Sequence, residues 1–203
     1  MRTRVVVAAC LLFLIASADA RAEQTIVFFR HGEKPIGGYG QLTCQGFNRA
    51  LALPPVLTSK FGVPNALYAP SPAVKVTDTA GSFYYVRPLA TIEPLAVKLG
   101  MPVNTKYGYN AITSLQSALM NAGYASATIF VAWEHLMLKK LVQNIMNAYG
   151  GSVAVPAWPA DDYDSLYVVR ATYGTAADGT TTINAQFTHE YEGLNGQPTA
   201  CPF

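Results

Sequence analysis

Short apolar runs, rich in β-branched and aromatic residues, alternate along the chain with segments of helical periodicity. Such runs are typical of buried strands, and three of them occupy residues 25–29, 66–69 and 128–133. Helical patterns occupy residues 45–53, 88–100, 113–122 and 136–149. Pro54-Pro55 is expected to end the first helix, and Pro94 to kink or restart the second.

Two longer runs near the C-terminus alternate apolar and polar residues and predict strands at 165–173 and 180–191. Asp178-Gly179 between them is a hairpin signal. Strand-helix alternation through residue 150 predicts a mostly parallel, helix-covered sheet. The expected fold is therefore a three-layer α/β/α sandwich with an antiparallel C-terminal hairpin. The chain shows no repeats or linkers, so residues 23–203 are expected to form a single domain.

The first 22 residues have the pattern of a secretory signal peptide. A basic start, Met1 to Arg4, precedes the apolar stretch Val5 to Ala16, and small residues flank two cleavage candidates near Ala20 and Ala22. The apolar stretch is too short for a stable membrane anchor. We therefore expect residues 1–22 to be removed and the protein to be exported, either to the periplasm or into the medium.

Removal of this leader changes both the charge and the cysteine count. Eleven basic and eleven acidic residues remain, so the slight positive charge of the whole chain gives no indication of nucleic-acid binding. The two remaining cysteines, Cys44 and Cys201, would be exported to an oxidising compartment. The sequence leaves open whether they form a bridge or two separate thiols, because a bridge requires a short Cα–Cα distance that the sequence does not reveal.

Two predicted strands end in residues that can carry chemistry. The first runs into Arg30-His31-Gly32-Glu33, and the third into Glu134-His135. If these strands are parallel neighbours, both histidines lie at the same edge of the sheet, where open α/β folds bind their ligands. The arrangement favours a functional site over two unrelated surface histidines.

Several segments, taken in order, resemble the signature of the histidine phosphatase superfamily, the phosphoglycerate-mutase-like phosphatases. They are Arg30-His31-Gly32-Glu33, Leu42-Thr43-x-x-Gly46, Tyr68-Ala69-Pro70-Ser71-Pro72, Arg87-Pro-Leu-Ala-Thr91-Ile-Glu93-Pro94 and His135. Each segment is loose alone, but the ordered set from residue 25 to about 150 is specific. The resemblance implies a histidine-phosphatase-like catalytic domain that hydrolyses phosphomonoesters without a metal or other cofactor.

The resemblance also implies roles for individual residues. Arg30, Arg87 and His135 would donate hydrogen bonds to the oxygens of a phosphoryl group. Neutral His31 would attack phosphorus through one ring nitrogen and form a phosphohistidine, while its other nitrogen donates to a nearby backbone carbonyl. The expected partner is a small phosphorylated substrate; its identity and the oligomeric state stay open.

The proton donor to the leaving group is the least defined of these roles. Glu134 is the first choice because it directly precedes His135 at a strand end, provided that the strand has ended there. The family more often has a small residue at this place. Glu33 and Glu93 are the alternatives, and each could instead hold an arginine. Two other functions stay open: a non-catalytic phosphate- or phosphoprotein-binding module, and an exported structural domain.

Other conspicuous side chains are interpreted as structural or solvated. We expect Arg49 to be a solvated helix residue and His189 a surface residue on the last strand. Asp161, Asp162 and Asp164 lack calcium-site spacing and are interpreted as a solvated acidic loop. The aromatic pair Trp158 and Tyr163 could border the substrate opening or cover the core. Segments 71–86, 101–112 and 151–164 show no readable pattern.

Overall fold

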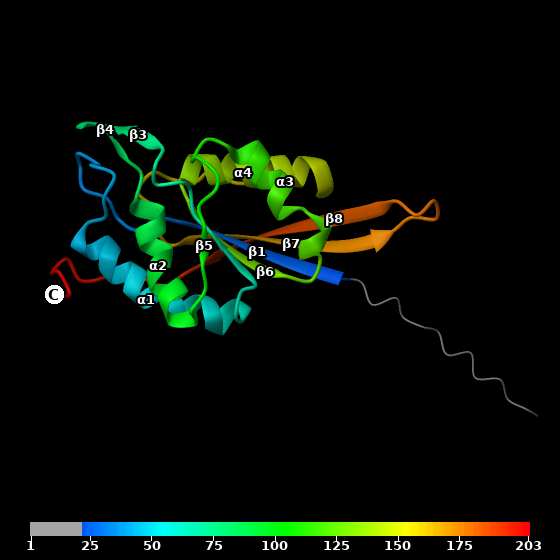
Figure 1. Cartoon of the computed structure of the whole chain (residues 1–203), viewed down its shortest axis with the longest axis horizontal. Helices are drawn as coiled ribbons and strands as arrows, with labels where there is room; N and C mark the ends of the chain where they lie inside the picture. Colours follow the sequence, from blue (N-terminus) through cyan, green and yellow to red (C-terminus); the bar gives the residue numbers. More distant parts are fainter. Residues whose placement is uncertain (1–21) are drawn as a thin grey trace, which may run out of the picture.

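The computed structural model describes residues 22–203, so the predicted signal peptide lies outside the described residues. A six-stranded sheet with the order β5-β2-β6-β1-β7-β8 forms the centre of the molecule (Figure 1). Its strands are β1 (Ala22–Arg30), β2 (Ala66–Tyr68), β5 (Val103–Asn104), β6 (Thr128–Trp133), β7 (Ser165–Thr175) and β8 (Thr181–Tyr191). Strands β5, β2, β6 and β1 pair in parallel, whereas β7 and β8 add an antiparallel hairpin. The predicted sheet is confirmed.

Helices cover both faces of the sheet (Figure 1). They are α1 (Cys44–Phe61), α2 (Arg87–Leu99), α3 (Ile112–Leu119) and α4 (His135–Tyr149), with a short 3₁₀ turn η1 (Ala122–Tyr124) after α3. Strand β1 shows why: Ile26 and Phe28 pack in the core under α3 and α4, while Val27 and Phe29 pack in the core under α1 and α2. Within residues 22–203, none of the helices combines the length and hydrophobicity needed to cross a membrane.

Two features differ from the expected element pattern. Helix α1 does not end at Pro54-Pro55 but continues to Phe61. Each proline removes a helical hydrogen bond, yet Leu53 and Leu57 beside them are fully buried, and burying two leucines stabilises by about 3–6 kcal/mol. The hairpin of β3 (Lys75–Asp78) and β4 (Gly81–Tyr84) and the edge strand β5 lie in segments where the sequence predicts no element.

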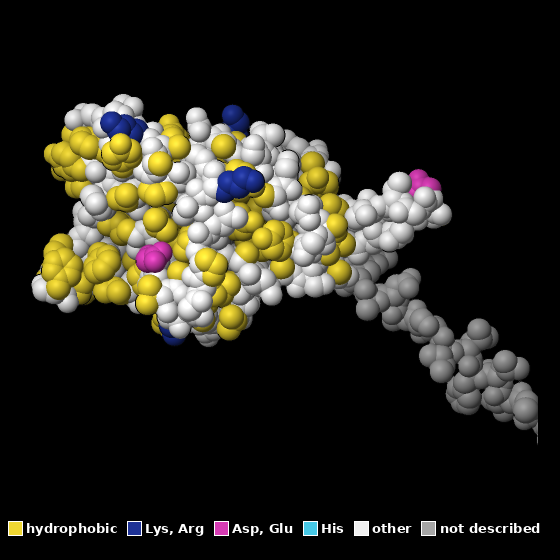
Figure 2. Space-filling model, viewed as in Figure 1, with side chains coloured by type: hydrophobic (Ala, Val, Ile, Leu, Met, Phe, Trp, Pro, Cys, Tyr) yellow, Lys and Arg dark blue, Asp and Glu magenta, His cyan; other side chains and the backbone are white. Residues whose placement is uncertain are grey.

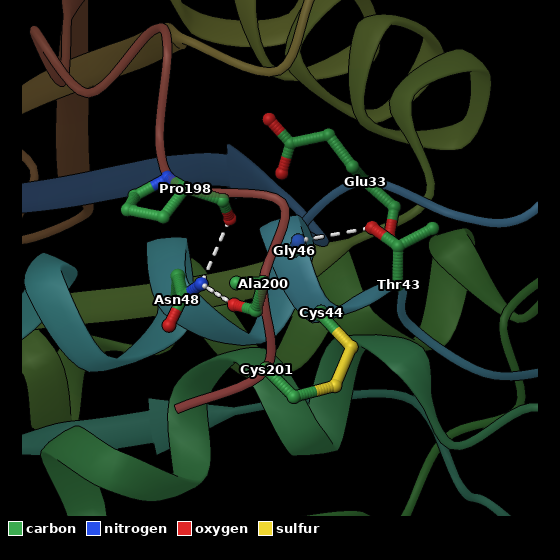
Figure 3. Close-up of a disulfide and its surroundings, with 8 residues drawn as sticks. All are labelled: Glu33, Thr43, Cys44, Gly46, Asn48, Pro198, Ala200 and Cys201. Carbon is green, nitrogen blue, oxygen red and sulfur yellow. Dashed lines mark hydrogen bonds between the residues drawn. A yellow bond between two sulfur atoms is a disulfide. The ribbon is translucent and has the colours of Figure 1, made fainter. Parts of the chain in front are cut away.

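A disulfide joins Cys44, at the start of α1, to Cys201 near the C-terminus (Figure 3). The two Cα atoms are 4.7 Å apart, within the range that a bridge requires. The Asn48 side chain donates to the carbonyls of Pro198 and Ala200, both at 2.8 Å. Of the two possibilities that the sequence leaves open, the structure has the bridge, which fixes the chain end against α1.

Arg49 is buried, so the expectation of a solvated helix residue is wrong. Its guanidinium binds Glu33 at 2.8 Å, Glu192 at 2.6 Å and Asp164 at 3.4 Å. Asp164 is buried too and accepts a hydrogen bond from the backbone of Leu194 at 2.7 Å, so the acidic loop is not solvated as a whole. Arg49 thus joins the segment after β1 to both ends of the C-terminal hairpin.

Three carboxyl groups around one guanidinium leave the cluster with excess negative charge. Burial opposes the charge on Arg49, but Glu33 and Glu192 outweigh that effect and raise its pKa. Burial raises the pKa of Glu192 to about 8, against the opposing effect of Arg49. Burial therefore favours the protonated form of the Glu192 carboxyl, which brings the cluster closer to neutral than its composition suggests.

This cluster predicts a specific pH dependence of stability. Between its ordinary pKa of 4.5 and about 8, Glu192 is protonated in the folded chain and ionised in the unfolded chain. Stability that Glu192 contributes at acidic pH is therefore lost as the pH rises through this window, by at most about 1.4 kcal/mol per pH unit. We expect Glu192→Gln to remove this loss, as measured by urea unfolding at acidic and mildly alkaline pH. Glu190→Gln, at a partly exposed neighbour, is the control; equal pH profiles for the wild type and Glu192→Gln would contradict the assignment.

Candidate active site

The parallel pairing of β1 with β6 brings the two histidine-bearing segments together. Arg30 is the register partner of Trp133, and the ladder continues with a 3.1 Å hydrogen bond from the His31 backbone N–H to the Trp133 carbonyl. His31 and Glu134 therefore leave the sheet at the same edge. Helix α4 begins directly at His135, with Glu134 as its N-cap. The site lies at the carboxyl ends of the strands, as the sequence predicts.

The His31 side chain is buried and held in one tautomer. Its Nδ1 lies 2.7 Å from the Gly32 carbonyl oxygen. A carbonyl can only accept, so Nδ1 carries the hydrogen and Nε2 keeps its lone pair. Burial lowers the pKa of His31 well below its ordinary value, and the charges of Arg87 and Arg30 act in the same direction. The imidazole is therefore neutral at neutral pH and can act as a nucleophile.

Close backbone contacts hold the loop that follows His31. The Gly32 N–H donates to the Thr91 hydroxyl at 3.0 Å, and that hydroxyl donates to the Arg87 carbonyl at 2.9 Å. A Cβ atom on Gly32 would lie 2.5 Å from the Gly46 carbonyl oxygen, and one on Gly46 would lie 2.6 Å from the Glu33 nitrogen. Both glycines are therefore needed for the approach of the loop to α1, and Thr91 ties it to α2.

Arg30 is buried at the end of β1, where backbone groups fix it. Its Nη1 donates to the carbonyls of Ala160 and Asp162, at 2.7 and 2.9 Å. Its guanidinium carbon lies 3.9 Å from the centre of the Tyr163 ring, a cation–π contact. Burial lowers the pKa of Arg30, although an arginine remains protonated in proteins. These contacts aim a positive charge at the same edge of the sheet.

Arg87 is buried in the first turn of α2 and depends on an acidic partner. Its Nη1 binds Asp78 at 2.8 Å and the Gly38 carbonyl at 3.2 Å. Asp78 also binds Lys34 at 3.0 Å. Burial opposes the charge of Asp78, but hydrogen bonds from Arg87 and Lys34 outweigh it and lower its pKa. Asp78 is therefore ionised and orients Arg87.

Each of the two arginines keeps a buried donor without a partner. Among the described residues, the Nε atoms of Arg30 and Arg87 are buried and make no hydrogen bond. Leaving a buried donor unpaired costs about 1–3 kcal/mol, and more for a charged group. Two such donors beside the neutral His31 form an arrangement that an anion would satisfy.

Glu134 and His135 form the other side of the edge. Glu134 Oε2 accepts from the Met137 N–H at 2.8 Å, and Oε1 lies 2.7 Å from Nδ1 of His135. Burial opposes ionisation of Glu134, but hydrogen bonds from His135 and from the first turn of α4 outweigh it and lower its pKa. The strand ends at Trp133, so the geometric condition for Glu134 to face the site is met.

The two alternative carboxylates lie in different surroundings. Glu33 is held by Arg49, whose Nε and Nη2 both bind it. Glu93 is exposed on α2, nearly two turns after Arg87. The charge of Glu134, in contrast, acts on the buried Arg30. Of these three carboxylates, Glu134 is the one whose charge acts on Arg30.

Several residues at the site received no role from the sequence. Asp78 and Tyr85 lie in segment 71–86, where the sequence shows no readable pattern. Thr91 belongs to the motif that begins at Arg87, so the motif could have indicated its role. Tyr163 borders the site, with its ring centre 6.3 Å from that of His31. Trp158 instead lies buried in the core, its ring centre 4.3 Å from that of Tyr167.

Surface shape alone does not locate this site. A hollow of about 970 Å³ lies at the opposite end of the sheet, lined by residues of β7 and β8 and by Ala22, Ala122 and Ala125. A smaller one, of about 310 Å³, lies between Leu42, Phe47, Ala90 and Phe203. Neither is lined by His31 or the two arginines. We therefore base the site on its buried polar groups, which carry the chemistry.

Hydrophobic side chains gather at the end of the molecule that holds α1, β3 and β4 (Figure 2). Ile36 and Phe203 are almost fully exposed, and Tyr84 is 60% exposed. Ile36 follows the His31 loop by only a few residues. The segment that follows this loop thus exposes one large apolar side chain.

The state of His31 can be tested directly. We expect its pKa, measured by NMR titration of the ring, to lie well below 6.5, because burial and the charges of Arg87 and Arg30 favour the neutral form. Replacing Arg87 by glutamine removes one positive charge and is expected to raise the pKa of His31. A pKa of His31 at or above 6.5, or one that Arg87→Gln leaves unchanged, would contradict this description.

Comparisons with known proteins place the fold. No protein-family model and no curated protein matches the sequence. A structure called mycobacterial hydrolase 2 shares 13% identity with a TM-score of 0.50, over 82% of this chain and 89% of that one. A mycobacterial glucosyl-3-phosphoglycerate phosphatase, Rv2419c, has 10% identity and a TM-score of 0.48, over 81% and 97%. A phosphoserine phosphatase variant from Entamoeba histolytica, bound to phosphoserine, shares 11% identity with a TM-score of 0.47. The match covers 84% of this chain and 98% of that one.

Likeness at this level of identity concerns the fold. The six-stranded sheet, its parallel strands and its antiparallel hairpin agree with the architecture that strand-helix alternation along the sequence predicts. The predicted fold class is confirmed, and the chain shares its overall fold with mycobacterial hydrolase 2.

Proposed function

We propose that this protein is a phosphomonoester hydrolase that works without a metal, through a phosphohistidine on His31. The observation that carries the proposal is the setting of His31. A neutral imidazole with a fixed tautomer lies buried at the carboxyl end of β1, near two arginines whose Nε donors have no partner. A nucleophile among unsatisfied positive donors suits a phosphate ester.

In the first step, Nε2 of His31 attacks phosphorus and forms the P–N bond. The bond from phosphorus to the ester oxygen breaks, and its electron pair leaves on that oxygen, which takes up a proton. Charge on the non-bridging oxygens is stabilised by Arg30, Arg87 and His135. Because the arginines are fixed by protein carbonyls and by Asp78, they need little rearrangement when this charge develops.

In the second step, water attacks the phosphohistidine. The P–N bond breaks, its electron pair returns to Nε2 of His31, and the water's proton passes to the group that served as acid in the first step. Residues 22–203 contain no cluster of three or more histidine, cysteine or acidic side chains that could hold a metal ion. Each step of the proposal uses only the chain's own groups and water.

Glu134 is proposed as the proton donor. Its lowered pKa keeps it ionised in the free protein, which opposes this role. A phosphate dianion bound beside it adds negative charge and raises the pKa of a neighbouring carboxyl. Glu134 would thus gain its proton when the substrate binds, and His135, in contact with its Oε1, would take part in that transfer.

We also propose that the protein is exported and acts on a small phosphorylated substrate. The pattern of residues 1–22 supports export. The bridge between Cys44 and Cys201 is compatible with it, because disulfides persist mainly in oxidising compartments.

The first test uses 4-nitrophenyl phosphate with a chelator present. We expect the wild type to turn it over equally with and without chelator, and His31→Ala to lose activity by at least about a thousandfold. His189→Ala, at the exposed histidine of β8, is the matched control and is expected to be unaffected.

Each deviation in this test has a distinct meaning. Activity that disappears with chelator contradicts the metal-free mechanism, and activity retained by His31→Ala contradicts the nucleophile. Binding of inorganic phosphate without any turnover would instead favour a non-catalytic phosphate-binding module.

The second test concerns Glu134. A proton donor matters most when the leaving group is a poor one, so Glu134→Gln is expected to slow hydrolysis of an alkyl phosphate by about a hundredfold and of 4-nitrophenyl phosphate much less. Glutamine keeps an oxygen for the α4 cap, so the fold is retained. Glu93→Gln, on the exposed face of α2, serves as control. Equal slowing of both substrates would remove Glu134 from this role.

A further inference from the structure

Tyr85 lies between the end of β4 and the start of α2 and is fully buried. Its hydroxyl is one of the few buried polar groups of the described chain that has no hydrogen-bond partner. Other buried tyrosines differ. Tyr167 donates to the Pro156 carbonyl and Tyr173 to the Gln24 side chain, both at 3.0 Å. The unpaired hydroxyl of Tyr85 therefore calls for a specific explanation.

The position of Tyr85 beside His31 and Arg87 explains why its hydroxyl has no partner in the free protein. Its ring centre lies 6.0 Å from that of His31, edge to face at 89°, and the Arg87 guanidinium carbon lies 4.8 Å from the ring centre. Tyr109 packs against the ring from another side, with centres 5.6 Å apart. The side chain is thus held rigidly in the wall of the site, among the groups proposed to contact phosphate.

The hydroxyl is a donor throughout the working pH range. Burial raises the pKa of Tyr85 and Glu134 adds to it, whereas Arg87 and Arg30 oppose it by their charge and Arg87 also by its proximity to the phenol oxygen. The phenol therefore stays neutral and keeps its hydrogen. Arg87 can only donate, so the phenol hydrogen has no acceptor among the described residues. A buried phenol without an acceptor costs stability, whereas phenylalanine would fill the same space without that cost. Such a cost is expected where a group is kept for a ligand.

We propose that Tyr85 is a further catalytic residue, whose hydroxyl donates a hydrogen bond to a non-bridging oxygen of the transferring phosphoryl group. The inference rests on the proposed function. It adds a neutral donor to the charged donors Arg30 and Arg87, and three buried groups without partners then share one anionic acceptor. Phosphoryl oxygens suit this set because they offer several lone pairs within a small volume.

The test compares Tyr85→Phe with Tyr173→Phe, each of which removes one hydroxyl from a buried ring. The readouts are thermal unfolding, kcat/KM for 4-nitrophenyl phosphate, and the dissociation constant of inorganic phosphate measured by calorimetry. We expect Tyr85→Phe to lower kcat/KM and phosphate affinity by about 10- to 100-fold. Its Tm is expected to rise by about 2–4 °C, because an unpaired buried hydroxyl is removed.

Tyr173→Phe is expected to behave in the opposite way. It loses the hydrogen bond to Gln24 at the far end of the sheet, so its Tm falls while kcat/KM and phosphate affinity stay unchanged. This contrast separates a ligand contact from a structural role, which would lower stability and activity together.

The outcomes also separate the two proposals. Wild-type turnover with an unchanged Tyr85→Phe overturns the role of Tyr85 and leaves the proposed function standing. Phosphate binding without turnover, weakened by Tyr85→Phe, supports the contact while overturning the hydrolase. A wild type that binds no phosphate overturns both.

Discussion

The site depends first on the parallel pairing of β1 with β6. Both strands are buried on both faces, so their side chains lock into two separate cores and fix the register. A slip of one residue would turn every side chain of a strand to the opposite core. The hydrogen bond from His31 to the Trp133 carbonyl extends this register one step beyond the strand. Packing of the core thereby determines where the imidazole stands relative to Glu134 and His135.

Beyond the end of β1, ion pairs and close backbone contacts, rather than core packing, determine where the site residues lie. Arg30 and Arg87 bring positive charge into a buried edge, and Asp78 and three backbone carbonyls compensate only part of it. The Nε donors of Arg30 and Arg87 make no stabilising hydrogen bond in the free protein. Other contacts must therefore hold this edge of the sheet in place. The Arg49 cluster does this for the loop after His31, by binding Glu33 and anchoring it to the C-terminal segment.

Periodicity along the chain predicted the main strands and helices, because each is dictated by local burial on one or two faces. Short motifs predicted Arg30, His31 and Arg87, since these residues stand at element ends. Burial of Arg49 could not be predicted in this way, because its partners Asp164 and Glu192 lie 115 and 143 residues away in sequence. The helix propensity of a residue carries no information about such distant carboxylates.

The same reasoning explains why short motif segments mark this site while the stretches between them carry no readable pattern. Gly32 and Gly46 lie so close together that a Cβ atom on either would clash with backbone. The Gly32 N–H also donates to the hydroxyl of Thr91 on α2. The residue type at each of these positions is therefore fixed by contact, whereas the number of residues between them is not. Tyr85 and Asp78 belong to an intervening stretch, and so the wall of the site around His31 is where this chain can differ from others of the same fold. Specificity for a substrate is then expected to reside in the hairpin of β3 and β4 and the segment that leads from it into α2.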